Sequence, residues 1–184
     1  MKSPCFFLIG LCFWIVSCHS SLQSEVQFLQ SSVISFPEEL YSLNGNLFEL
    51  DTLNDTPARI VIWFDSTGCN RCKALDVYSY GFVYDYCRDS LNMNCDFTII
   101  FSPSEDQLES VMCFIWERNI DIPIFIDVNN QFGMMNDFIP SDYKFHAFLL
   151  NDSNKIVLIG PPNYNKPMWN LYKEMISDLF DSHM

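Results

Sequence analysis

The chain has 184 residues and a formal net charge of −13, from 10 Lys and Arg against 23 Asp and Glu. Hydrophobic residues make up 49% of it, including 17 Phe, which is enough for a core and excludes general disorder. The acidic balance argues against nucleic-acid binding, because phosphate contacts need Lys/Arg clusters. No apolar run reaches the ~18 residues of a membrane-spanning helix. The 8 cysteines are consistent with a disulfide framework, metal ligands or redox thiols until their positions are considered.

The first residues have the composition of an export signal. Lys2 precedes the apolar run CFFLIGLCFWIVS over residues 5–17, which is too short to span a bilayer but fits the core of a signal peptide. The following Ile15-Val16-Ser17-Cys18 resembles a bacterial lipobox, whose cysteine becomes an acylated N-terminus. Two or more acyl chains anchor a protein stably, whereas one gives marginal binding. An ordinary cleaved signal with incidental cysteines is the alternative interpretation.

A lipoprotein signal divides the chain into three parts. We expect a signal over residues 1–17, a lipidated tether and edge segment over 18–44, and one folded domain over 45–184. The Ser/Gln-rich composition of residues 19–35 favours a spacer. We expect a cell-envelope lipoprotein that faces the periplasm, an oxidising compartment in which disulfides persist. The residue after Cys18 is not an acidic retention signal, which favours the outer over the inner membrane.

Five short apolar runs are predicted as strands. Each is continuous in Ile, Val and Phe rather than alternating, which is typical of strands buried on both faces of a sheet. The runs are RIVIWF (59–64), FTIIF (97–101), IPIFIDV (122–128), FHAFLL (145–150) and KIVLI (155–159). Residues 70–90 and 104–118 have the length of helices, and the second begins with capping-box spacing at Ser104 and Gln107. A hairpin composition at residues 152–154 predicts that the last two strands are antiparallel.

The final segment is predicted as a helix after Gly160-Pro161-Pro162. Asn165 is the expected N-cap and Pro167 lies in the first turn. An apolar stripe follows at Met168, Tyr172, Met175, Ile176 and Leu179. With a short helix near residues 130–137, the order of elements is β-α-β-α-β-α-β-β-α. The predicted fold class is therefore α/β, a three-layer arrangement with a central mixed sheet and helices on both faces.

Cys69 and Cys72 stand between the first core strand and the following helix. Cysteines at this spacing can close a small disulfide, and the N-terminus of a helix stabilises a thiolate on the first of them. Arg71 and Lys73 add positive charge in an otherwise acidic chain. Such a thiolate is both a nucleophile and a good leaving group in thiol–disulfide exchange. A structural disulfide or half of a zinc site is the alternative, although zinc needs a second Cys/His pair at short spacing.

With this motif, the sequence resembles the thioredoxin-like superfamily, in its membrane-tethered TlpA/ResA branch, over about residues 45–180. FHAFLLNDSNKIVLIG (145–160) is similar to the branch's strand-turn-strand segment. The resemblance implies that Cys69 attacks a substrate disulfide and that Cys72 resolves the mixed disulfide.

The chain departs from the pattern of this branch at several positions. Phe145 takes the place of the cis-proline that shapes the substrate groove, and Gly68 stands where the family usually has Trp. Trp63 occupies the position of the buried acid of ordinary thioredoxins. These departures bear more on activity than on fold.

Four further residues have weaker signals. The resemblance places His146 near the cysteine pair, where it could act as a base toward Cys69 or as a metal ligand. Sco-type copper carriers use such a histidine but a longer cysteine spacing. The simpler interpretation is a histidine hydrogen-bonded at a strand end. Cys87 and Cys95 flank a short connection and could form a structural bridge, while Cys113 is more typical of an apolar filler.

These observations predict a lipid-anchored thiol–disulfide oxidoreductase. Its partners would be disulfides or thiols of exported proteins, a membrane-linked electron donor or acceptor, and the membrane itself, with no nucleic acid. No cofactor and no metal are expected. The alternative is a non-enzymatic lipoprotein that uses a thioredoxin-like fold as an interaction module, with a structural or vestigial disulfide at Cys69 and Cys72. Peroxidase chemistry fits less well, because Thr67 and Cys69 have the wrong spacing.

Overall fold

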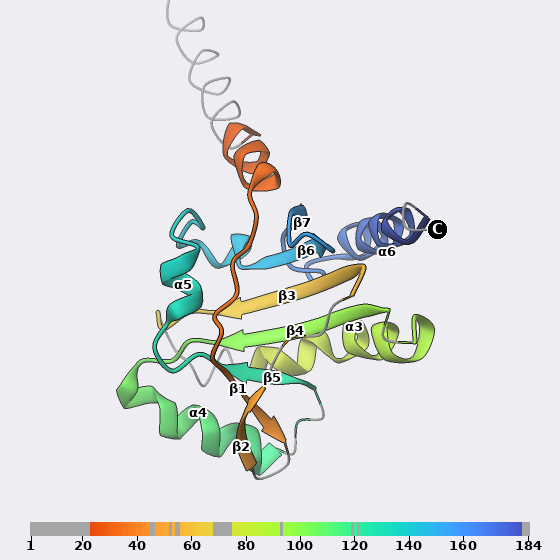
Figure 1. Cartoon of the computed structure of the whole chain (residues 1–184). Coiled ribbons are helices and arrows are strands. Elements are labelled where there is room, and N and C mark those ends of the chain that lie inside the picture. The colour runs from red at the N-terminus through yellow and green to blue at the C-terminus, as the bar shows by residue number, and fades with distance from the viewer. Residues whose placement is uncertain are drawn as a thin grey trace, which may run out of the picture.

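The computed structural model describes residues 23–44, 47–51, 53, 56–67, 75–92, 94–118, 120 and 122–181. A seven-stranded mixed sheet forms the middle layer, in the order β2-β1-β5-β4-β3-β6-β7 (Figure 1). The strands are β1 (Leu40–Asn44), β2 (Leu47–Asp51), β3 (Ala58–Phe64), β4 (Cys95–Phe101), β5 (Ile124–Ile126), β6 (Ala147–Asn151) and β7 (Ile156–Ile159). The predicted α/β class is confirmed.

Strand direction follows the predicted connections. β3 pairs in parallel with β4, and β4 with β5, through helical crossovers. β6 runs antiparallel to β3, and the hairpin to β7 is antiparallel as predicted. β1 and β2 form an antiparallel hairpin that joins the sheet beside β5. β2 is thus one edge strand of the sheet.

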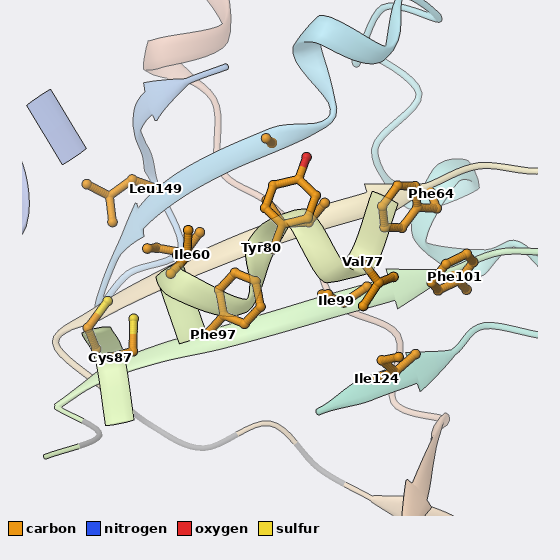
Figure 2. Packing of buried hydrophobic residues seen from close by; sticks show 14 of the residues in the cluster. Ile60, Phe64, Val77, Tyr80, Cys87, Phe97, Ile99, Phe101, Ile124 and Leu149 are labelled. Carbon is orange, nitrogen blue, oxygen red and sulfur yellow. The ribbon is translucent and has the colours of Figure 1, made fainter. Parts of the chain in front are cut away.

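Side chains from both faces of the central strands are buried, which explains their continuous apolar runs. In β3 every residue is buried, and alternate residues contribute to two different cores. The larger core (Figure 2) includes Ile60, Ile62 and Phe64. It lies under η1 (Val77–Tyr80), α3 (Gly81–Asp85), η2 (Tyr86–Ser90), α4 (Glu105–Arg118) and α6 (Lys166–Asp181). The smaller core includes Val61 and Trp63 and is covered by α5 (Gln131–Met135) and an N-terminal segment.

The helix predicted over residues 70–90 is irregular where it is described. Its residues from Val77 onward form a 3₁₀ turn, a short α-helix and a π-helical turn in succession. The buried side chains are Val77, Tyr80, Val83 and Cys87. These four residues follow one another at intervals of three or four, so one face of the segment is buried in spite of its irregular backbone.

The C-terminal helix agrees closely with its prediction. The Asn165 side chain accepts a hydrogen bond from the Met168 N–H at 2.9 Å, as an N-cap does. Tyr172 and Ile176 are buried, and the other members of the predicted stripe pack against the same core. The Tyr172 hydroxyl donates to the Gly160 carbonyl at 2.8 Å. Because Gly160 has φ +117°, a conformation that side chains disfavour, this turn requires glycine.

The N-terminal segment packs on the domain. The sequence analysis assigned residues 18–44 to a tether and edge segment. In the described part, Leu29 lies on a helix over residues 23–31 and Ile34 follows it, and both are fully buried. The Ile34 N–H donates to the Asn154 carbonyl, and the Ser35 N–H donates to the Asn136 side chain. Leu29 and Ile34 therefore add to the core of the domain. No helix among the described residues is long and apolar enough to cross a bilayer.

Candidate functional site

A cavity of about 660 Å³ lies where β3 ends. Because β6 is antiparallel to β3 and β7 to β6, the start of β6 and the end of β7 lie at this same edge of the sheet. Three separate loops therefore meet there. The cavity is lined by Ile62, Trp63, Phe64, Asp65, Thr67, Asp76, Tyr80, Ser141, Asp142, Tyr143, His146, Ala147, Pro161, Asn163 and Tyr164.

The predicted cysteine pair falls in the segment that links two walls of this cavity. Cys69, Cys72, Arg71 and Lys73 lie outside the described residues, as does Cys18. The nearest described residues that line the cavity on either side of the motif are Thr67 and Asp76. The described residues that flank the motif on both sides therefore line one cavity.

The turn that leads into the motif is stabilised by Asp65. Its carboxylate accepts a hydrogen bond from the Thr67 N–H at 3.3 Å and another from the Thr67 hydroxyl at 2.8 Å. An Asp side chain that bonds two residues ahead is a common way to turn a chain at the end of a strand. This turn directs the chain away from β3 and toward the motif.

His146 lines the same cavity. The residue is 4% exposed, and its ring stacks on the Trp63 indole with centroids 4.5 Å apart. Nε2 lies 2.9 Å from the Pro140 carbonyl, which can accept but not donate, so Nε2 carries the proton. This is the strand-end histidine of the simpler interpretation. Any proton that His146 takes up as a base must therefore go to Nδ1.

Phe145 occupies the last position of a 3₁₀ turn, η3 (Tyr143–Phe145), immediately before β6. Its N–H donates to the Asp142 carbonyl at 2.9 Å, a bond that proline could not make. The Asp142 side chain also accepts from the Lys144 N–H at 3.1 Å. Phe145 is half-buried and is not among the residues that line the cavity. The turn thus depends on the Phe145 N–H, a backbone donor that a proline at this position would lack.

Trp63 is fixed by a buried chain of hydrogen bonds. Its indole N–H donates to the Ser102 hydroxyl at 3.0 Å, and Ser102 donates to Asp127 at 2.9 Å. The Asp127 carboxylate also accepts from the N–H groups of Gln131 and Phe132, both at 2.9 Å, at the start of α5. Asp127 is 1% exposed, so its charge is stabilised by these donors. The network connects the ends of β3, β4 and β5 and holds the tryptophan against His146.

Tyr80, Asp76 and Asn163 also line the cavity. Burial, and secondarily the Asp76 carboxylate, raise the pKa of Tyr80 well above its usual value, while a hydrogen bond with Asn163 acts in the opposite direction. Asn163 donates to the Ser79 hydroxyl at 2.6 Å. Tyr80 is therefore a neutral phenol at any physiological pH.

The cavity differs from the core because acidic side chains and two exposed tyrosines, here called the rim tyrosines, line it. Three carboxylates line it, from Asp65, Asp76 and Asp142. Tyr143 and Tyr164 also line it and are each 71% exposed. Sequence reasoning missed these two tyrosines because residues 141–143 and 161–164 meet only through the antiparallel order of β6 and β7. Among the described residues, no group of three or more His, Cys, Asp or Glu side chains could hold a metal ion.

Comparisons with known proteins identify the fold. No protein-family model matches the chain, and no curated protein matches it. A thioredoxin-like protein of Porphyromonas gingivalis matches the structure with a TM-score of 0.52 and 12% identity, over 83% of this chain and 97% of that one. A thioredoxin-like protein solved in its oxidised form has a TM-score of 0.50 and 19% identity, over 83% and 97%. A Sinorhizobium meliloti protein has a TM-score of 0.50 and 16% identity, over 82% and 86%. The chain therefore has a thioredoxin-like fold.

Proposed function

We propose that this thioredoxin-like chain is a lipid-anchored thiol–disulfide oxidoreductase of the TlpA/ResA type. Cys69 would attack a disulfide of an exported protein, and Cys72 would then attack the mixed disulfide and release the reduced substrate. In this exchange one disulfide forms at Cys69 and Cys72 as the substrate disulfide breaks. A membrane-linked electron donor of the thiol class would reduce the pair again.

One observation carries this proposal: Thr67 and Asp76, on either side of the motif, line one cavity with His146. A cavity at the end of β3, with an aromatic rim, suits an extended polypeptide that presents a disulfide. The attacking thiol needs a lowered pKa, and the sequence places Arg71 beside Cys72 for this purpose. The fold of the structural neighbours is compatible with the same chemistry.

A redox titration of the full chain tests the proposal. Wild-type protein is equilibrated with thiol–disulfide buffers, and the thiols are alkylated and located by mass spectrometry. We expect a reversible two-electron couple at Cys69 and Cys72 and exchange with a model disulfide. C69S should abolish exchange, and C72S should trap a mixed disulfide on Cys69. C113S is the matched control, because Cys113 is exposed on α4 and does not line the cavity.

The same titration shows whether the cysteine pair reduces or oxidises its substrates. A potential near thioredoxin's ~−270 mV indicates a reductase, and one near ~−120 mV indicates an oxidant. A pair that stays oxidised under strongly reducing conditions, or that does not exchange, refutes the proposal.

The second candidate is an interaction module without exchange activity. It is favoured by the turn at Phe145, whose N–H is bonded within η3 and does not reproduce the proline of the family pattern. In that case Cys69 and Cys72 would be a permanent disulfide.

Membrane attachment is proposed separately, from the lipobox-like sequence that ends at Cys18. Expression in a bacterial host with labelled fatty acid should label wild-type protein and leave C18S unlabelled. Equal labelling of both, or of neither, would refute lipidation at this residue.

A further inference from the structure

A second pair of cysteines is buried in the larger core, far from the candidate site. Cys87 lies in η2 and Cys95 is the first residue of β4, and both side chains are 0% exposed. Figure 2 shows Cys87 at the edge of the cluster, pointing inward from its helical turn. Both residues belong to one continuous apolar cluster.

Cys87 and Cys95 are both free thiols in the structure, and their side chains interact. The Cys95 thiol donates to the Asp96 carbonyl, with 3.7 Å between sulfur and oxygen. The interaction with Cys87 first, and burial second, raise the pKa of Cys95, so the thiol stays protonated. A short connection joins the two residues, with Asn92 in a left-handed conformation and a hydrogen bond from the Asn94 N–H to the Leu91 carbonyl. This tight connection keeps the two cysteines near one another.

The pair is separate from the predicted redox motif. Cys95 pairs with Ala58, the first residue of β3, whereas the motif follows the last residue, Phe64. Six steps along a strand at ~3.3 Å each separate these positions by roughly 20 Å. Cys95 therefore lies at the opposite end of β3 from the residue that leads into the motif.

We propose that Cys87 and Cys95 close a structural disulfide that fastens η2 to the start of β4. The two thiols are oxidised to one S–S bond, and two protons and two electrons pass to a small-molecule disulfide oxidant, which is reduced to two thiols. A thiolate first attacks the oxidant to give a mixed disulfide, and the second cysteine then displaces the bound thiol. Because both sulfurs are fully buried, the bond forms before the core closes or when η2 opens locally. Once buried, it is shielded from exchange.

Peptide mapping of the full chain tests this proposal independently of Cys69 and Cys72. The reduced chain is refolded with oxidised glutathione, denatured, alkylated and digested with trypsin. Cleavage after Lys73, Arg88 and Arg118 separates Cys87, in peptide 74–88, from Cys95, in peptide 89–118. We expect the two peptides to be joined without reductant and to separate after reduction.

Cys113 provides the control, because it lies in the same peptide as Cys95 but is exposed. The linkage should persist in C113S and be absent in C95A. When folded, reduced protein is alkylated without denaturant, Cys113 should be labelled and both members of the buried pair protected. Labelled thiols at both Cys87 and Cys95 after oxidative refolding would overturn the proposal. Loss of the joined peptides in C113S would also overturn it, because the partner of Cys87 would then be Cys113.

Discussion

The buried ion pair between Arg59 and Asp96 offers the sharpest test of the packing. The residues face each other on the parallel strands β3 and β4, and their side chains are 8% and 9% exposed. Arg59 Nε donates to Asp96 Oδ2 at 3.2 Å, and a guanidinium Nη donates to the Asn154 side chain at 3.3 Å. The guanidinium also lies 5.1 Å from the ring centre of Phe36. Removal of either partner leaves a buried charge without its main compensation.

Replacement of Arg59 by Met should therefore lower the free energy of unfolding by about 3–5 kcal/mol. D96L should cost a similar amount, because the guanidinium then loses its carboxylate. The double variant R59M/D96L should be much closer to wild type than the sum of the two losses, since neither charge remains buried. Urea unfolding, monitored by circular dichroism, gives the free energy of unfolding of the wild type and the three variants. A constant m value checks two-state behaviour.

An exposed ion pair in the same protein serves as the control. Arg88 contacts Asp85 and Asp89 at 2.9 and 2.7 Å, but its side chain is 40% exposed. R88M should change the urea midpoint little, because water already solvates these charges. A loss below about 1 kcal/mol in R59M, or a double variant as unstable as the sum of the single variants, would refute the reasoning.

Two further predictions concern the buried tyrosines and the close contact between Gly133 of α5 and the Trp63 ring. Burial raises the pKa of Tyr80 and of Tyr172 above the usual 10.0, so the unfolded chain releases these protons first as the pH rises. Stability should be fully retained below pH 10 and fall above it by up to roughly 2.7 kcal/mol per pH unit for the pair, and Y172F should lessen the slope. An unfolding midpoint that stays flat to pH 11 would contradict this. A Cβ at Gly133 would lie 2.9 Å from the Trp63 ring, so G133A should cost about 1–3 kcal/mol and perturb tryptophan fluorescence. A Cβ at Gly81 would meet nothing within 4 Å, and G81A should be neutral or stabilising, so equal effects of the two substitutions would contradict the packing argument.

The sheet was predictable because its strands are apolar on both faces. In β4, Ile99 belongs to the larger core and Ile100 to the smaller one, and such burial needs an unbroken apolar run. The helix after β7 was predictable because its cap and stripe are local signals. β5 is shorter than its run, which extended to Val128, because buried Asp127 ends it and bonds to the start of α5.

The N-terminal segment could not be predicted in this way. Leu29 and Ile34 stand in a Ser/Gln-rich stretch, and the segment is held by hydrogen bonds to Asn136 and Asn154, more than a hundred positions away. Neither has the periodicity that marks a helix or strand face. Composition alone therefore favoured a spacer, while long-range packing determines the structure.

The candidate site also contains one residue that the sequence suggested and others that it did not. His146 was placed near the motif through the resemblance, and the structure puts it in the cavity that both flanks of the motif line. The rim tyrosines Tyr143 and Tyr164 carry no local signal of function. They approach the site because two antiparallel strands return their loops to the end of β3, which is a property of topology.

The packed N-terminal segment also sets how far the domain could work from a membrane. The described part of the helix at the N-terminal end starts at residue 23, and the proposed lipid would be attached to Cys18. Five fully extended residues span at most ~18 Å. A lipidated chain of this kind would be held within a short radius of the bilayer, so its substrates would have to present their disulfides close to the lipid headgroups. Lengthening the stretch between Cys18 and the helix would extend that radius and the range of proteins within reach.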